Sequence, residues 1–305
     1  MGQLVGKPQY VRQGPCIVIY GPPGIGKTSL IAGLATALHE AGMGPVLHAD
    51  WELSTESVVP LMEHIPTDSL KVWMPDLMQA PADEGMDMVD TAINIGAGAL
   101  VVDTIGAFAQ AHLDWLTTRD YTQKAGKATL RPGVRTPKGM KIVSPTMQDY
   151  GMAANAFLTW MRYALRLRNK GIPLVLIGHE RLLAAEDEAG QTIDAHGGPE
   201  FVGRKLTREF DKLAQVIVHG RYVRRPGKPP LRVMDGETDG IWAAKDRLHL
   251  WPKGGYDITA ETPKDIVDRA TGFWRPVVER LKDKSPENGN GETKKVVRRR
   301  RRKQG

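Results

Sequence analysis

The amino-acid sequence predicts an α/β protein with a mainly parallel sheet flanked by helices. Four short apolar runs occupy residues 16–20, 45–50, 99–103 and 172–179, and stretches with helical periodicity lie between them. Continuous apolar runs of this length are typical of strands that helices cover on both faces of a sheet. The alternation of such runs with helices therefore favours parallel strands joined by helical crossovers.

The helices of this expected sheet are placed by their periodicity and by their boundaries. The first should run from residue 28 to about residue 41, directly after a glycine-proline cluster that ends the first apolar run. Two more are expected at residues 83–95 and 149–169, where apolar residues recur at helical spacing. Each of these helices precedes or follows an apolar run, as a parallel arrangement requires.

The C-terminal part of the sheet has a different pattern. Residues 215–223, 230–234 and 241–251 predict strands, and a turn such as Arg225-Pro226-Gly227-Lys228 would join the first two as an antiparallel hairpin. A last helix is expected at residues 264–281. The sheet should therefore end in antiparallel strands.

The domain organisation follows from where the apolar periodicity stops. Residues 283–305 are rich in Gly, Glu, Asn, Lys and Arg and lack that periodicity, so we expect a disordered basic tail there. Residues 1–282 are expected to form a single domain with a core at about 11–251.

The positive charge is concentrated in two places. The formal net charge of the 305 residues is +7, yet residues 294–303 alone hold eight lysines and arginines, so the rest of the chain is nearly neutral. A second basic segment, residues 119–141, holds seven cations and one aspartate. This distribution predicts contact with polyanions at defined places, although basic runs are often only solvated.

The composition also indicates the cellular compartment in which the protein works. The single cysteine, Cys16, cannot close an intrachain disulfide, and the sequence has no apolar run long enough to cross a bilayer. The first ten residues do not read as a secretion signal. We expect a cytoplasmic protein without membrane contact.

The strongest motif lies between the first apolar run and the first helix. Residues 21–28 match G-x-x-x-x-G-K-[ST], in which glycines let backbone N–H groups surround a phosphate chain, the lysine reaches the β and γ phosphates and the hydroxyl binds Mg²⁺. The alternative is a chance glycine-rich turn. The pattern predicts ATP and Mg²⁺ as cofactors. The expected nucleotide-binding residues are Gly21, Pro22, Pro23, Gly24, Ile25, Gly26, Lys27, Thr28 and Ser29.

Acidic residues follow other predicted strands. Asp103 ends the third apolar run and is expected to hold Mg²⁺ together with Thr28, unless it only caps a turn with Thr104. Glu52 follows the second run, as does Asp50, and Glu52 is the preferred base for water, against a solvated loop glutamate. His179 and Glu180 end the fourth run, where a polar side chain would sense the γ-phosphate or bond locally to the backbone.

The order of these motifs resembles the RecA-like ATPases. GPPGIGKTS, HADWE, LVVDT, LIGHE and finally Lys245-Asp246-Arg247 occur in that order, and the chain is most similar to phage-encoded nucleotide-binding proteins of the Sak recombinase type and to phage AAA-domain proteins. The similarity covers about residues 11–251. It implies a RecA-like P-loop NTPase fold.

The resemblance also implies roles for particular residues. Lys27, Glu52 and Asp103 match catalytic positions, and His179 occupies the switch position where bacterial recombinases have glutamine. Lys245 and Arg247 correspond to a basic finger that contacts the γ-phosphate of a neighbouring subunit, although such cations can also simply protect a strand edge.

The resemblance further implies that two loops, at about residues 108–147 and 181–208, line a DNA channel. The first includes the basic segment together with Trp115 and Tyr121, so basic residues lie among aromatic ones that stack on bases. The alternative is an ordinary insertion whose charges face water.

Together these features predict an ATPase, stimulated by DNA, that binds single-stranded DNA for phage recombination, annealing or repair. The expected partners are single-stranded DNA, further copies of the chain in a ring or filament, and a single-strand-binding protein. Two other functions stay open: a DNA motor or loader ATPase, and a nucleotide-dependent interaction module that does not hydrolyse ATP.

Overall fold

The computed structural model describes residues 13–76, 79–118, 121–124, 127–130, 134–135, 141–142, 144–186, 192–201, 206 and 212–282. Its centre is a ten-stranded sheet with the strand order β14-β12-β11-β1-β9-β4-β2-β3, where β10 pairs with β9 and β13 with β11. The bounds of its central strands are β1 Cys16–Gly21, β2 Val46–Asp50, β3 Leu70–Trp73, β4 Ala99–Asp103, β9 Leu174–Glu186 and β11 Val216–Arg225. All pairs among these six strands are parallel.

Antiparallel strands complete the sheet at its C-terminal side. They are β12 (Lys228–Asp235), β13 (Lys245–Asp246) and β14 (Tyr256–Asp257), and all their pairings are antiparallel. The predicted fold class, a mainly parallel sheet with antiparallel strands toward the C-terminal end, is confirmed.

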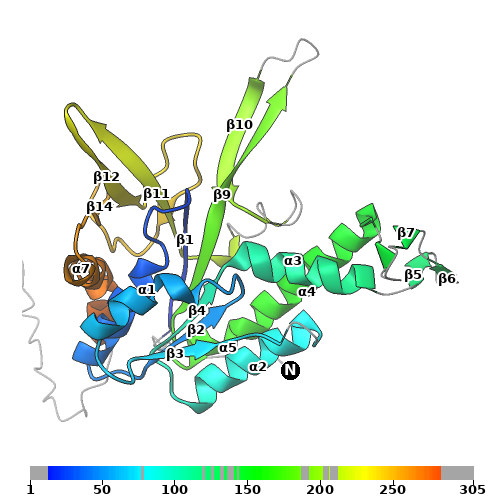
Figure 1. The fold of residues 1–305 in the computed structure, drawn as a ribbon, viewed down its shortest axis with the longest axis horizontal. Helices are drawn as coiled ribbons and strands as arrows, with labels where there is room; N and C mark the ends of the chain where they lie inside the picture. Colours follow the sequence, from blue (N-terminus) through cyan, green and yellow to red (C-terminus); the bar gives the residue numbers. More distant parts are fainter. Residues whose placement is uncertain are drawn as a thin grey trace, which may run out of the picture.

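Helices cover both faces of this sheet (Figure 1). On one face α1 (Ser29–Glu40) and α7 (Pro263–Lys282) pack on alternate residues of the central strands, including Ile17 and Val101. The opposite face is covered by α2 (Pro81–Asn94), α3 (Ile105–Thr118), α4 (Met147–Ala164) and α5 (Arg166–Asn169). Because the strands are buried on both sides, their sequences are continuous apolar runs rather than alternating ones.

Three sequence-based predictions of elements need correction. Residues 105–118, most of which were expected to belong to a loop, form helix α3, and residues 181–186 form an antiparallel hairpin with β10 (Thr192–Pro199). Residues 241–251 were predicted to form one strand, but of these only β13 belongs to the sheet as a strand. The residues after it turn away because the Asp246 carboxylate accepts the backbone N–H groups of Leu248, Leu250 and Trp251. These N–H groups are thereby withdrawn from a strand ladder.

Short elements occupy the remaining described segments. Two 3₁₀ helices, η1 (Thr55–Ser57) and η2 (Val59–His64), lead from β2 to β3, and neither they nor β3 were predicted. The segment between α3 and α4 contains two short hairpins, β5 (Tyr121–Lys124) with β6 (Lys127–Leu130) and β7 (Val134–Arg135) with β8 (Lys141–Ile142). The expected loop is therefore partly extended, and the side chains of the basic segment lie outside the description.

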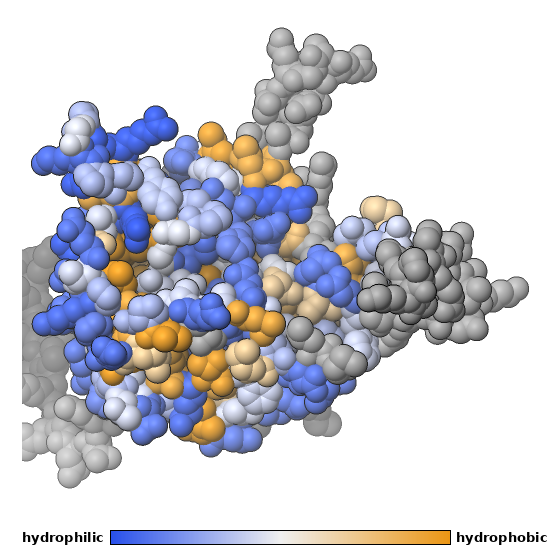
Figure 2. All heavy atoms as spheres, viewed as in Figure 1, coloured by the Kyte–Doolittle hydropathy of each residue, from blue (hydrophilic) through white to orange (hydrophobic). Residues whose placement is uncertain are grey.

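The predicted basic tail, residues 283–305, also lies outside the described residues. On the face drawn in Figure 2, hydrophilic residues predominate and hydrophobic ones form small groups among them. Within the described part of the chain, no helix has both the length and the apolar character needed to cross a membrane.

Candidate nucleotide site

The glycine-rich turn of residues 21–28 joins the end of β1 to the start of α1. Gly24 and Gly26 have φ values of 74° and 105°, a region in which glycine is strongly favoured over other residues. Ile25 between them is fully buried and anchors the turn. The sequence at this position therefore makes a tight loop directly before the N-terminus of a helix, where N–H groups attract anions.

Lys27 lies inside this loop. Its side chain is only 6% exposed, and Nζ donates hydrogen bonds to the carbonyl oxygens of Gly21, at 2.9 Å, and Pro22, at 3.0 Å. Burial lowers the pKa of Lys27, while the negative charges of Asp103 and Glu52 act in the opposite direction. The ammonium is thus held against the loop by carbonyl groups that a phosphate chain can replace.

Thr28 and Asp103 meet as the motif predicts. The Thr28 hydroxyl donates to Asp103 Oδ2 over 3.1 Å and makes no cap hydrogen bond to its own helix. Asp103, at the end of β4, is 1% exposed. A hydroxyl and a carboxylate oxygen side by side fit Mg²⁺, which takes one or two protein oxygens together with the phosphates of its nucleotide.

Glu52 faces the same edge of the sheet. Its Oε1 accepts a hydrogen bond from the Thr104 hydroxyl at 2.8 Å and lies 2.7 Å from His179 Nε2. The hydrogen bond with His179 is the main reason why the pKa of Glu52 is lowered, and the same bond raises the pKa of His179. Glu52 is therefore an ionised carboxylate at neutral pH, and its orientation is set by two neighbours.

The other acidic candidates are engaged elsewhere. Asp50 is fully buried and its Oδ1 accepts the backbone N–H of Ser54, which shapes the turn that presents Glu52. Leu53 in that turn has a φ of 56°, an unusual value for a leucine. Glu180 lies 2.9 Å from His219 Nε2, on the opposite side of the strand from His179. Asp103, Glu52 and Glu180 all raise the pKa of Lys27, and of the two glutamates Glu52 is the one that Thr104 and His179 hold at this edge of the sheet.

The predicted finger residues lie far along the sheet from the glycine-rich turn. Lys245 is opposite Ile217 in β13, and the Arg247 N–H donates to the Gln215 carbonyl at the start of β11. Gln215 in turn bonds to Cys16, the first residue of β1. Since the turn follows the last residue of β1, the chain does not bring Lys245 and Arg247 to its own nucleotide site.

Sequence reasoning missed part of the site. Thr104 was considered only as a turn residue, although it donates to Glu52, and His48 was not considered although its Nε2 lies 3.7 Å from Asp103 Oδ2. Tyr222 was missed too; its hydroxyl lies 3.4 Å from the Pro23 carbonyl oxygen. A hydroxyl directly after a strand-ending aspartate was a usable signal for Thr104, whereas the contacts of His48 and Tyr222 depend on strand order.

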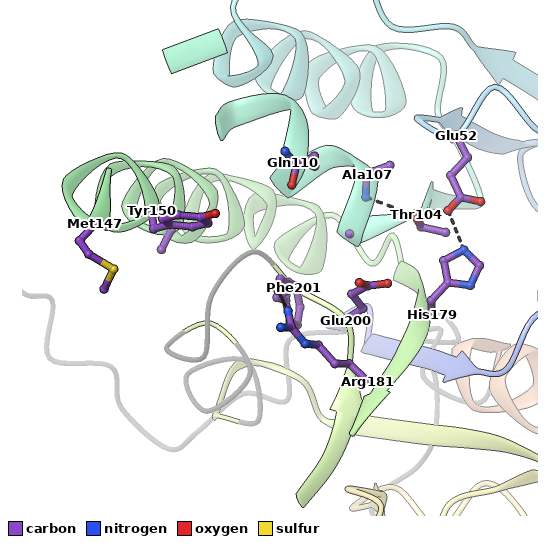
Figure 3. A pocket seen from close by; sticks show the side chains of 13 residues that line it. Glu52, Thr104, Ala107, Gln110, Met147, Tyr150, His179, Arg181, Glu200 and Phe201 are labelled. Atoms are coloured by element: carbon purple, nitrogen blue, oxygen red, sulfur yellow. Dashed lines mark hydrogen bonds and ion pairs between the residues drawn. The ribbon is translucent and has the colours of Figure 1, made fainter. Parts of the chain in front are cut away.

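A cavity of about 860 Å³ adjoins Glu52 and His179 (Figure 3). Figure 3 shows Glu52 and His179 at one end and Met147 and Tyr150 of α4 at the other. Its remaining lining residues come from α3, α4, the middle of β9 and the chain that follows β4 and β10, and are Thr104, Gly106, Ala107, Gln110, Gly151, Ala154, Arg181, Glu200 and Phe201.

This fold and this turn define a P-loop nucleotide-binding protein. The profile of a family described as "AAA domain" matches residues 13–248, and the chain belongs to that family. Membership confirms the expected P-loop ATPase class, whereas the narrower resemblance to Sak-type phage proteins stays a prediction.

Comparison with solved structures found the crystal structure of a KaiC-like protein from the hyperthermophilic archaeon Pyrococcus horikoshii OT3. The match covers 83% of this chain and 88% of the KaiC-like protein's chain, with a TM-score of 0.46 and 13% sequence identity. Among the curated proteins no match was found.

Proposed function

We propose that this protein binds Mg-ATP at residues 21–29 and hydrolyses it with Glu52 as the residue that orients water. The observation that carries the proposal is the placement of Glu52 at the same sheet edge as Lys27 and Asp103. Glu52 and Asp103 are both close enough to affect the pKa of Lys27, and Asp103 contacts Thr28. A cation, a metal-binding pair and an ionised carboxylate are the groups that phosphoryl transfer to water uses.

The roles of the residues follow from their contacts. Lys27 would exchange the carbonyls of Gly21 and Pro22 for phosphate oxygens, and Thr28 with Asp103 would hold Mg²⁺. When bound, the metal neutralises charge on the phosphate oxygens. Among the described residues, the two that bond to the Glu52 side chain both use Oε1, so Oε2 is the oxygen that would orient the attacking water.

We further propose that hydrolysis is stimulated by single-stranded DNA, in phage recombination, annealing or repair. Support comes from the two basic segments, residues 119–141 and 294–303, the first of which lies in the connection between α3 and α4. Lys245 and Arg247 would act on the nucleotide of a neighbouring copy in a ring or filament, because their own site is at the other end of the strands. A single-strand-binding protein is a further proposed partner.

The test is the rate of phosphate release with and without single-stranded DNA, for the wild type and for Lys27→Ala. The proposal expects release by the wild type, an increase with DNA, and loss of activity in Lys27→Ala. Nucleotide binding without any release would instead identify an interaction module, and translocation on duplex DNA would identify a motor.

A further inference from the structure

His48 lies in the middle of β2, on the face of the sheet that α1 covers. Its partner in the ladder with β4 is Val101, which belongs to the core cluster under α1, and Asp103 follows two residues later on the same face. The side chain of His48 is fully buried. An imidazole therefore lies in an apolar layer, beside the carboxylate that is placed to hold Mg²⁺.

The polar atoms of this ring have no partner among the described residues, because neither nitrogen of His48 has a hydrogen bond there. At least one of the two nitrogens must carry a hydrogen. A buried donor without an acceptor costs stability, and an apolar side chain in the same space would avoid that cost. Val46, Leu47 and Ala49 beside it in β2 are all apolar. The packing of β2 therefore does not explain why a histidine stands here.

The position of Asp103 offers an explanation. Its Oδ2 lies 3.7 Å from His48 Nε2, which is longer than an ordinary hydrogen bond. Both groups are shielded from water, since Asp103 is only 1% exposed, and the attraction between an N–H group and a carboxylate is stronger in such surroundings than at a surface. The carboxylate therefore favours the form of the ring that carries its hydrogen on Nε2.

The same carboxylate oxygen has a second neighbour on the other side of the site. The Thr28 hydroxyl donates to Asp103 Oδ2 over 3.1 Å. A hydroxyl hydrogen rotates to suit its surroundings, whereas the ring of His48 is enclosed within a central strand of the sheet. Of these two donors, His48 is the one whose direction the fold fixes.

We infer that His48 is a positioning residue for Asp103, and that its Nε2–H group holds the carboxylate in the direction in which Asp103 and Thr28 bind Mg²⁺. Partners behind metal ligands commonly orient those ligands in this way, and their loss weakens metal binding. His48 touches neither the nucleotide nor the metal in this role. The inference rests on the proposed binding of Mg-ATP at residues 21–29.

The experiment measures how much Mg²⁺ is needed for half-maximal binding of a fluorescent ATP analogue. His48→Gln and His48→Met form a matched pair, because their side chains have similar length and shape but only the glutamine amide can donate a hydrogen bond. His48→Met should need about tenfold more Mg²⁺ than the wild type, and His48→Gln should need less than His48→Met. With a chelator in place of Mg²⁺, the wild type and both variants should bind the analogue equally, because His48 acts only through the metal-binding carboxylate.

Two further variants separate the donor from the shape of the side chain and from its place in the strand. His48→Phe keeps a ring but removes both nitrogens, so it should show the same increase in Mg²⁺ requirement as His48→Met. Leu47→Met is the control for position, because Leu47 is the neighbouring residue and is buried on the opposite face of the sheet. Its Mg²⁺ requirement should equal that of the wild type. Thermal melting of each variant without nucleotide establishes that it is folded.

An unchanged Mg²⁺ requirement in His48→Met and His48→Phe would show that the ring only fills space, and equal requirements of His48→Gln and His48→Met would exclude the donor. Either result overturns the inference and leaves the binding of Mg-ATP standing. Weaker binding of the analogue by His48→Met in the chelator as well would assign His48 to packing alone and would also overturn it. No binding by the wild type would overturn the proposed function together with the inference.

Discussion

At the residue scale, the proposed chemistry depends on how Glu52 is held. Thr104 and His179 both contact Oε1, and the backbone on either side is shaped by Asp50 and by the left-handed Leu53. A carboxylate fixed in this way is oriented before nucleotide arrives, so little reorganisation is needed when water is positioned.

The substitution that tests the role of Glu52 most directly is Glu52→Gln. The amide retains the size of the side chain and an oxygen for Thr104, but it cannot take a proton, so phosphate release should fall by about a hundredfold or more. Nucleotide affinity should stay close to that of the wild type. Parallel phosphate-release and nucleotide-binding assays check this, and release at the wild-type rate would remove Glu52 from the mechanism.

The Glu52–His179 pair also predicts a pH dependence of stability. The pKa of Glu52 is lowered from 4.5 and that of His179 is raised from 6.5, so the ion pair stabilises the folded state between those two shifted values. Its contribution is lost as pH rises through the raised pKa of His179, and again as pH falls through the lowered pKa of Glu52.

Thermal melting of the wild type and of His179→Gln across pH checks this dependence. The difference in melting temperature should be largest at mildly acidic pH and should shrink in the alkaline range. It should be small throughout, because both side chains are about a third exposed. A difference that does not change with pH would contradict an ion pair.

At the scale of elements, most of the sheet could be predicted from the sequence. The parallel strands are buried on both faces and therefore have continuous apolar runs, and the glycine-rich turn determines where α1 begins. Helix α3 was missed because the family resemblance suggested a loop, although the buried residues Ile105, Ala109 and Leu113 recur every four residues and the Thr104 hydroxyl accepts the Ala107 N–H.

Other elements could not be predicted from local pattern. The β9–β10 hairpin projects from the sheet (Figure 1), so no buried face imposes an apolar alternation on it, and β3 is a partly exposed edge strand. Of the candidate site, the glycine-rich turn could be predicted because its residues are contiguous in the sequence. The pairing of Glu52 with His179, and the cavity behind it, depend on the order in which distant strands join.

The side chain of Asp246 explains why residues 247–251 are not a strand, and this gives a prediction for the element. Asp246→Ala removes the acceptor of three backbone N–H groups and should lower the free energy of unfolding by about 3 kcal/mol. Urea denaturation measures this. Asp268→Ala, on the exposed side of α7, should change stability by less than about 0.5 kcal/mol, and equal effects of the two variants would contradict the explanation.

At the scale of the whole molecule, the finger residues and the nucleotide site lie at opposite ends of the central strands. If Lys245 and Arg247 act on a neighbour, an intact site in one copy can be completed by an intact finger in another. Arg247→Ala and Glu52→Gln should each be nearly inactive alone. A mixture of the two should recover a measurable fraction of the wild-type rate of phosphate release.

The control for this mixing experiment is a pair of variants in the same site, Glu52→Gln with Lys27→Ala. Both retain the finger, and their mixture would recover activity only if one site took Glu52 from one copy and Lys27 from another. Since each site is built by one chain, that pair should in fact stay inactive. Activity in the control, or none in the first mixture, would contradict a finger supplied by a neighbour.

The central claim is that the turn between β1 and α1 binds the phosphates of ATP. Calorimetric titration of the purified protein with ATP in the presence of magnesium tests it most directly. We expect saturable one-site binding by the wild type and at least a tenfold weaker affinity for Lys27→Ala, because one buried charged contact to phosphate is lost. Absence of binding by the wild type, or unchanged affinity of Lys27→Ala, would contradict the account.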